Sequence, residues 1–192
     1  MLPVEKRLKT KEQLRQWLAC DRARYGKIGR LEYFLRCSER SILYRHQVLL
    51  RKTEYLYNNR KGVWRIYALR LQRMQNRYAL HIPINTCGKG LYVVHVGPVL
   101  FNSAAQVGDY CTFHMNTGLV AGGTNNDAPV LEDHVILGIG AVVLGGTHIA
   151  AGVAVGANAV VNRDVSEANI TVAGVPAKKV SSKSRADWNK KA

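Results

Sequence analysis

A repeat of six residues runs through the second half of the chain. Counted from Val107 to Val161, every sixth position is apolar except one. The ten positions are Val107, Phe113, Leu119, Asn125, Leu131, Leu137, Val143, Ile149, Val155 and Val161. An α-helix repeats about every 3.6 residues and a half-buried strand about every two, so neither accounts for this period. It is typical of a parallel β-helix, in which three short faces make one coil and each coil stacks on the next.

Small or short side chains often follow four places after these positions, where a corner must turn without crowding. They are Cys111, Thr117, Val135, Ala141, Thr147, Val153 and Ala159. The repeat is interrupted over residues 122–129, where Gly, Asn, Asp and Pro gather as they do in loops. Because the phase returns at Leu131, we expect a surface excursion that leaves and rejoins one corner of a left-handed parallel β-helix.

The basic residues are concentrated ahead of this repeat. Residues 1–80 hold 20 Lys and Arg against 6 Asp and Glu, whereas residues 81–192 hold 8 against 7. We therefore predict a basic α-helical domain over residues 1–78, the β-helix over 79–177 and a basic C-terminal tail over 178–192. The expected fold class is mainly β with α, the helices preceding the β-helix.

Helical patterns occupy the N-terminal part. Thr10 and Gln13 have the spacing of a capping box at the start of a first helix. A second, amphipathic helix is expected from Leu31 to about Asn58. Its apolar positions are Leu31, Phe34, Leu35, Ile42, Leu49 and Leu56. A third helix should run from Val63 into the β-helix.

Several protein classes are disfavoured. The four cysteines show neither CxxC spacing nor a paired framework, which predicts buried reduced thiols. Charges begin at Glu5 and no apolar segment precedes them, which argues against a secretory signal and for a cytoplasmic protein. Residues 135–162 carry no Lys, Arg, Asp or Glu and could span a bilayer, but their glycines, His148 and six-residue period fit stacked coils better.

The basic helices leave several partners open. They can be a solvated surface that keeps an assembly soluble and self-repelling. They can also contact an anionic glycan or the inner face of an anionic membrane, where each basic side chain gains about 1 kcal/mol. Nucleic acid is not expected, because neither a base-stacking aromatic platform nor helix-turn-helix spacing is present.

Histidines are the candidate chemical groups of the β-helical part. Hexapeptide β-helices are mainly acyltransferase scaffolds, a link that rests on fold analogy and needs a site to support it. Transfer of an acyl group from a thioester to a hydroxyl requires one general base, and imidazole serves near neutral pH. His95 is the strongest candidate, because Gly90, Gly97 and Pro98 leave its surroundings open; a structural histidine is the alternative.

Five motifs in this order resemble those of serine O-acetyltransferases, and especially the short, basic forms associated with surface-polysaccharide synthesis. The resemblance covers about residues 78–180. The motifs are Gly88-Lys89-Gly90-Leu91 with His95 and Val99-Leu100-Phe101-Asn102, Val107-Gly108-Asp109, Gly138-Ile139-Gly140-Ala141, Val155-Gly156-Ala157-Asn158, and Ala173-Gly174-Val175-Pro176-Ala177-Lys178.

The resemblance implies a homotrimer that uses acetyl-CoA as co-substrate, transfers acetyl to a small-molecule or glycan hydroxyl, and needs no metal. It implies His95 as the general base. We expect His114 as a second catalytic residue, because it lies one coil, or 19 residues, further along the chain. The implied acetyl-CoA-binding residues are Gly138, Ile139, Gly140, Ala141, Gly156, Ala157 and Lys178. The implied acceptor-binding residues are Asn102, Asn116 and Asp127.

The chain departs from that family at three positions. The family has an aspartate directly before the catalytic histidine, a second aspartate one turn earlier and a further histidine before a proline. Val94, Leu80 and Ala128 stand there instead. The groups left to orient His95 are His114, Asn116, Asp109 or a backbone carbonyl. Because the lost carboxylates are the obvious partners of an amino acid's ammonium group, we expect a sugar acceptor, with L-serine as the alternative.

Two further classes stay open. A γ-type carbonic anhydrase binds zinc through two histidines five residues apart and a third from another coil, whereas the β-helical histidines here are 14 or more residues apart. A non-catalytic trimeric relative would keep the scaffold and lack the chemistry.

Overall fold

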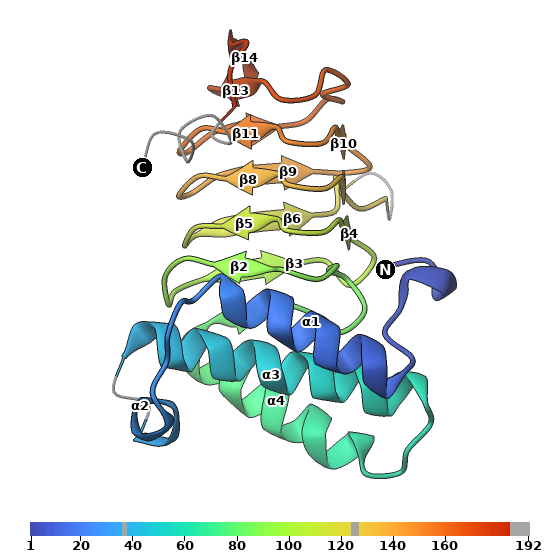
Figure 1. The fold of residues 1–192 in the computed structure, drawn as a ribbon. Coiled ribbons are helices and arrows are strands. Elements are labelled where there is room, and N and C mark those ends of the chain that lie inside the picture. Colours follow the sequence, from blue (N-terminus) through green and yellow to red (C-terminus); the bar gives the residue numbers. More distant parts are fainter. Residues whose placement is uncertain (36–37, 124–126, 185–192) are drawn as a thin grey trace.

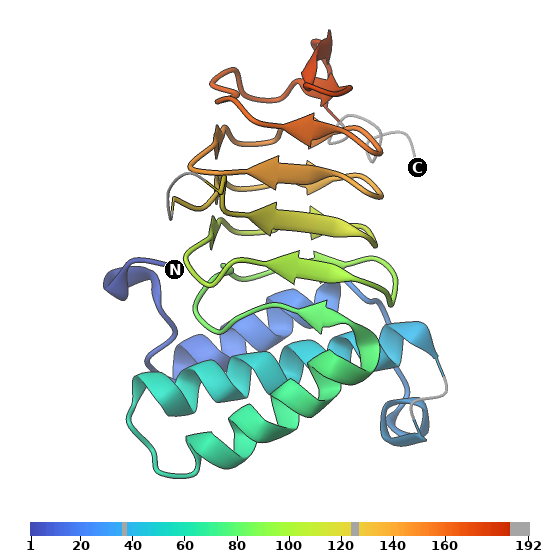
Figure 2. The same cartoon turned by 180° about the vertical axis from the view of Figure 1, so that it is seen from behind.

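The computed structural model describes residues 1–35, 38–123 and 127–184. Within them, helices come first and a stack of short strands follows (Figure 1). The helices are the 3₁₀ helix η1 (Val4–Lys6) and the α-helices α1 (Lys11–Ala23), α2 (Arg30–Leu35), α3 (Glu39–Asn58) and α4 (Trp64–Tyr78). They lie beneath the first coil, at the opposite end of the molecule from the last strands (Figures 1 and 2).

The strands form three sheets, one for each face of the coil. Sheet A contains β1 (Leu80–His81), β3 (Val99–Phe101), β6 (Thr117–Val120), β9 (Val142–Leu144) and β12 (Val160–Val161). Sheet B contains β4 (Gln106–Val107), β7 (Val130–Leu131) and β10 (His148–Ile149). Sheet C contains β2 (Tyr92–Val93), β5 (Thr112–Phe113), β8 (Ile136–Leu137), β11 (Ala154–Val155), β13 (Thr171–Ala173) and β14 (Lys178–Ser181).

The register of the parallel strands matches the six-residue repeat. Val142 pairs with Val160, so one coil takes three hexads, or 18 residues. Thr112 pairs with Ile136, 24 residues on, because the excursion after β6 adds one hexad to that coil. The expected β-helix is confirmed, and its phase resumes after the excursion. Residues 124–126 of the excursion, Asn125 among them, lie outside the described residues.

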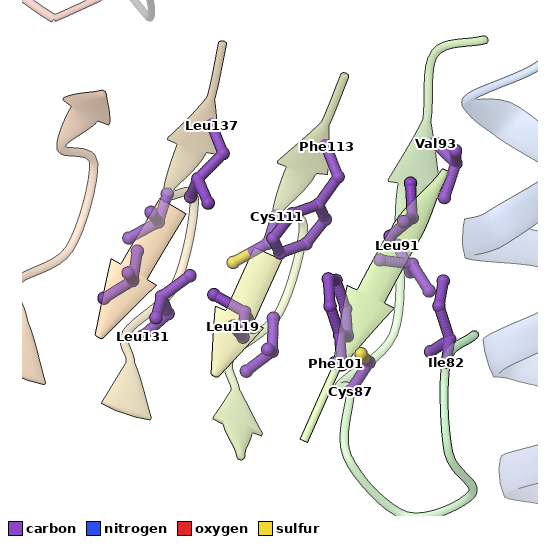
Figure 3. Close-up of a cluster of buried hydrophobic side chains, with 14 of the residues drawn as sticks. Ile82, Cys87, Leu91, Val93, Phe101, Cys111, Phe113, Leu119, Leu131 and Leu137 are labelled. Atoms are coloured by element: carbon purple, nitrogen blue, oxygen red, sulfur yellow. The ribbon is translucent and has the colours of Figure 1, made fainter. Parts of the chain in front are cut away.

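The core is the column of hexad residues inside the coils (Figure 3). The nine apolar hexad positions are each at most 2% exposed. Figure 3 shows Phe113, Leu119 and Leu137 pointing into the space that the three faces enclose. The short residues at the fourth place are also buried, each at most 5% exposed. Since burying one such large apolar side chain contributes about 1.5–3 kcal/mol, this column is the main stabilising feature of the β-helix.

The helices differ from expectation at the residues before α3. The Thr10–Gln13 capping box is present at the start of α1, as predicted. The single helix expected from Leu31 is instead two helices, and residues 36–37 between them lie outside the described part. Ser38 has extended backbone and caps α3, because its side chain accepts a hydrogen bond from the Ser41 N–H. A Ser in this conformation starts a new helix, and the apolar spacing across it gave no sign of the break.

The predicted apolar stripe is also not the face by which these helices pack. Leu31, Phe34 and Leu35 are 71%, 71% and 64% exposed. The face of α3 that packs on the coil is partly polar, with Gln47 and Arg51 among its fully buried residues. The docking face of α3 therefore combines apolar residues such as Leu43 and Leu50 with polar side chains that bond backbone carbonyls of the first coil.

Arg51 anchors the helices to the first coil. Its Nε lies 2.9 Å from Asp21 Oδ2 of α1, and its Nη1 lies 3.1 Å from Glu54 Oε2. The guanidinium also donates to the carbonyls of Cys87, at 2.9 Å, and Gly88. All three charged side chains are at most 1% exposed, so this ion-pair network is sealed from water.

The remaining features concern the thiols, the end of the chain and membranes. Cys87 and Cys111 are free and buried as expected, and burial raises the pKa of the Cys87 thiol to about 12. Cys20 is free but only partly buried, which differs from the expectation, and Cys37 lies outside the described residues. Residues 178–181, assigned to the tail from the sequence, form β14, which pairs antiparallel with β13.

Among the described residues, none of the helices has the length and apolar character needed to cross a bilayer.

Candidate functional site

One edge of the β-helix gathers most of the predicted site. It is the edge where the chain passes from sheet C to sheet A, formed by residues 94–98, 114–116, 138–141 and 156–159, and is called the C–A corner below. The turn 174–177, which joins β13 to β14 within sheet C, stacks on the last coil of this corner, because the Val160 N–H donates to the Gly174 carbonyl at 3.0 Å. Backbone hydrogen bonds link its successive coils. The N–H groups of Asn116, Gly140 and Asn158 donate to the carbonyls of Pro98, Met115 and Ile139 at 2.6, 3.1 and 2.8 Å. The corner is therefore a rigid column rather than a set of separate loops.

His95 stands at the helical end of this column, directly after β2. Its Nδ1 lies 3.1 Å from Glu39 Oε2, and the two side chains are 51% and 46% exposed. The other carboxylate oxygen, Oε1, accepts the Val96 N–H at 2.7 Å. Since a carboxylate only accepts, the contact assigns the proton to Nδ1 and leaves Nε2 as the proton acceptor. A histidine oriented in this way by a carboxylate can serve as a general base.

Glu39 is the functional residue that sequence reasoning missed. It is the first residue of α3 and lies 56 positions before His95 in the chain. The N-terminal end of a helix carries partial positive charge, which favours a carboxylate at this position. Docking of α3 through Gln47, which donates to the Leu91 carbonyl, and through Arg51 brings this helix end to the C–A corner. The only sequence signal was a Ser-Glu helix start in a basic segment, which carries no hint of His95.

His114 occupies the next coil of the same corner. Its ring centroid lies 6.3 Å from that of His95, with the planes tilted by 49°. Asn116 follows at the same turn, exposed and with a φ of 60°. His114 thus lies beside His95 and Asn116 lies on the same corner, whereas Asp109, a further candidate to orient His95, contacts Lys89 on a different edge.

The residues expected to bind acetyl-CoA continue the same column, except that the side chain of Ala141 is completely buried and belongs to the core. Ile139 is 42% exposed and Ala157 is exposed, so both side chains are open to solvent on successive coils. Gly140 has a φ of +71°, and a Cβ there would lie 2.0 Å from Asn158 Oδ1, so this turn accepts only glycine without rearrangement. Lys178 is exposed in β14, beyond the last of these turns, whereas its neighbour Lys179 pairs with Glu167 at 2.6 Å.

Two predicted acceptor residues lie elsewhere. Asn102 and Asp127 belong to the edge between sheets A and B, at the far end of the sheet A strands from His95. The Asn102 side chain accepts the Ala104 N–H at 2.8 Å and shapes that turn. Asp127 lies against Gly146: a Cβ added at Gly146 would be 3.0 Å from the Cβ of Asp127. Within one chain the structure does not bring these two residues to the His95 site.

The three departures from the family motif occupy apolar surroundings. Leu80 is completely buried in the first coil, and Ala128 packs against the core. Val94 is partly buried. Leu80 and Ala128 therefore contribute to packing in this chain, and the carboxylate that contacts His95 comes from Glu39 of α3 instead. Among the described residues, no group of three or more His, Cys, Asp or Glu side chains is arranged to hold a metal ion.

Comparison with known proteins gives a consistent set of relatives. No protein-family model matches the chain. A serine acetyltransferase of Synechococcus elongatus is 35% identical over 130 residues, which are 66% of this chain and 52% of that protein. The structure of soybean serine acetyltransferase matches with a TM-score of 0.66 and 27% identity over 87% of this chain and 69% of that one. The structure of a Brucella abortus serine acetyltransferase in complex with coenzyme A matches with a TM-score of 0.63 and 23% identity. The match covers 88% of this chain and 67% of that one.

The chain spans about half the length of the curated relatives it matches. What it shares with the solved structures is the fold, helices followed by the β-helix. By sequence and by fold, this chain is similar to serine acetyltransferases that carry a hexapeptide-repeat β-helix.

Proposed function

We propose that the protein is an acetyl-CoA-dependent O-acetyltransferase with His95 as its general base. The observation that carries the proposal is the contact between Glu39 and His95 Nδ1 at the head of the C–A corner. It leaves Nε2 of a half-exposed imidazole available to a substrate hydroxyl. A non-catalytic relative would have no need of a carboxylate brought from the helical domain to orient this ring.

The reaction follows from the orientation of His95. Nε2 takes the proton of the acceptor hydroxyl while the hydroxyl oxygen attacks the thioester carbonyl carbon of acetyl-CoA. The carbon–sulfur bond then breaks, the CoA thiolate leaves, and the imidazolium returns the proton to it. Glu39 holds the ring and stabilises the imidazolium formed in between. His114 and Asn116 are proposed as polar neighbours of the acceptor and of the oxyanion.

The C–A corner fits an extended acetyl-CoA molecule. Four coil steps separate His95 from Gly174, and at the usual strand spacing they span about 19 Å. Gly140 and Ala157 give this stretch little side-chain bulk, so a pantetheine arm can lie against backbone, and the exposed Ile139 offers it an apolar contact. Lys178, at the far end, is exposed and suited to a phosphate group of CoA. The Brucella relative in complex with coenzyme A supports the same co-substrate.

The relatives favour L-serine as the acceptor over the sugar that the sequence departures suggested. Glu39 weakens the objection to serine, because its half-exposed oxygens keep lone pairs for an ammonium group. The apolar side chains at Val94, Leu80 and Ala128 are the observation that keeps a sugar of surface-polysaccharide synthesis as the second candidate.

Release of CoA thiol from acetyl-CoA by the purified protein tests both acceptors. The protein is assayed with no acceptor, with L-serine, and with a panel of sugars and nucleotide-sugars. We expect release that depends on L-serine, with O-acetylserine as the product. Release only with a saccharide would replace serine by the second candidate. Absence of release with every acceptor would overturn the proposed acetyl transfer.

We also propose a homotrimer in which sheet A faces a neighbouring protomer. Outward positions of this sheet are aliphatic, with Leu100 53% exposed and Val142 and Val160 partly exposed in register above it. Such a face would place the edge that carries Asn102 and Asp127 near the C–A corner of another protomer, completing the acceptor site. Sedimentation equilibrium should give three chains per particle; a mass of one chain would contradict a shared site.

A further inference from the structure

A cationic groove lies between α3 and α4 on the surface of the helical domain. It is a cavity of about 480 Å³, within the usual range of ligand pockets. Five basic side chains from the two helices line it, and tyrosines lie at its margins. The basic residues are Arg45, Lys52, Arg70, Arg73 and Arg77.

The spacing of these residues places them on facing sides of the two helices. Arg70, Arg73 and Arg77 are three and four residues apart along α4, so they share one face. Arg45 and Lys52, seven apart, share a face of α3. At 100° per residue, this face is opposite the one that Leu50 presents to the coil. The groove is therefore separate from the His95 site and has no part in the proposed acetyl transfer.

The groove lacks negative charge. The sequence has no Asp or Glu between Glu54 and Asp109, so α4 carries four arginines and no carboxylate. As far as the structure describes the chain, none of the five basic side chains forms an ion pair. Like charges spaced this way on a helix destabilise it. A surface with no other purpose gains nothing from gathering them in one cavity.

Aromatic rings hold two of the arginines in place. The Arg45 guanidinium lies 4.9 Å from the Tyr33 ring centroid, and its Nη1 donates to the Tyr33 carbonyl at 2.7 Å. The Arg77 guanidinium lies 6.0 Å from the ring centroid of Tyr78. Planar guanidinium groups fixed around a hollow match phosphate oxygens better than flexible, scattered lysines do.

We propose that this groove binds a ligand through one or two closely spaced phosphate groups. Phosphate is favoured over carboxylate because several guanidinium groups line one cavity, and a phosphate offers three oxygens to share among them. The phosphate can belong to a soluble diphosphate or to a phospholipid headgroup. Both sources present the same oxygens to the same arginines, so the experiment has an arm for each.

The test measures binding to the full-length protein at fixed ionic strength. In one arm, inorganic pyrophosphate is titrated by calorimetry; in the other, the protein is sedimented with phosphatidylcholine vesicles with or without phosphatidic acid. The variants are the double substitution Arg73→Gln/Arg77→Gln and the control Arg65→Gln, which removes an exposed arginine of α4 outside the groove. All three positions are exposed, and circular dichroism confirms that each variant is folded.

We expect saturable binding in at least one arm, weakened about tenfold or more by the double substitution and little changed by Arg65→Gln. Binding in the pyrophosphate arm identifies a soluble ligand, and binding only to phosphatidic acid vesicles identifies a headgroup. Equal loss in the double variant and the control would show attraction to net charge alone and overturn the proposal. Absence of binding in both arms would overturn it as well.

Discussion

Substitution of His95 by alanine is expected to lower kcat for acetyl transfer by about 10²–10⁴-fold, the usual contribution of a general base. The variant lacks the imidazole that takes the hydroxyl proton as the oxygen attacks. The change should leave stability nearly unaltered, since the His95 side chain is 51% exposed. The measurement is CoA-thiol release under saturating acetyl-CoA, with the acceptor that supports turnover in the unmodified protein.

The companion variant Glu39→Gln separates the orienting role from the chemical one. The Gln side chain keeps the size of Glu39 but can donate its N–H to Nδ1 and so favour the unproductive tautomer of His95. We expect kcat to fall roughly 10- to 100-fold with KM for acetyl-CoA unchanged; the loss is smaller than in a buried triad because water reaches this half-exposed pair. Imidazole ¹⁵N shifts of His95 should show loss of the Nδ1–H tautomer, which a merely structural role would not produce.

A second histidine–glutamate pair on the same β-helix provides the matched control. His148 Nε2 lies 3.1 Å from Glu132 Oε1, and the side chains are 42% and 47% exposed. This pair has the same chemistry and similar exposure but belongs to sheet B, away from the C–A corner. His148→Ala and Glu132→Gln should therefore retain full activity. If His95→Ala keeps activity within twofold of the unmodified protein, the assignment of the base is wrong.

Substitution of Arg51 by alanine is expected to destabilise the fold by about 3–5 kcal/mol. It leaves the carboxylates of Asp21 and Glu54 buried without their cation and removes the donors to the Cys87 and Gly88 carbonyls. Burial already raises the pKa of the Glu54 carboxyl, so this group depends on Arg51 to stay ionised. Urea denaturation, followed by far-ultraviolet circular dichroism, measures the loss, which is a large share of the about 5–15 kcal/mol typical of a domain.

Arg40 of the same helix is the matched control for Arg51. Its pair with Glu32, at 2.7 Å, is partly exposed, with the Arg40 side chain 53% accessible. Arg40→Ala should leave the unfolding midpoint almost unchanged, because water replaces a surface ion pair. If Arg51→Ala does not fold at all, Asp21→Asn removes one charge with little change of shape and should give a smaller, measurable loss. Equal stability of Arg51→Ala and Arg40→Ala would show that the buried network does not hold the helices.

The β-helix was predictable because its determinant is local and periodic. Each hexad places one apolar side chain inward and one short residue at a corner, so Leu137 and Ala141 could be assigned to the core from their positions alone. The same counting located the excursion after β6. The break ahead of α3 was not predictable in this way, because the apolar spacing continues across Ser38 while the chain turns.

Part of the candidate site was predictable for the same reason, and part was not. His95, His114 and the small residues from Gly138 to Ala157 follow from the repeat and the family motifs, because residues one coil apart must stack on the same corner. Asn102 and Asp127 were grouped with them by motif, yet three strand residues of sheet A are enough to put Asn102 on another edge. Motif order alone does not distinguish the corners of a triangular coil.

The sequence by itself determined the β-helix, its core and the column of residues that stacks on the His95 turn, since each depends on a repeat that can be counted along the chain. Only the tertiary structure decided which carboxylate orients His95. That partner depends on where α3 docks on the first coil, and the docking rests on long-range contacts of Arg51 and Gln47 with backbone carbonyls. Such contacts leave no periodic trace, so Glu39 and His95 become neighbours only when the chain has folded.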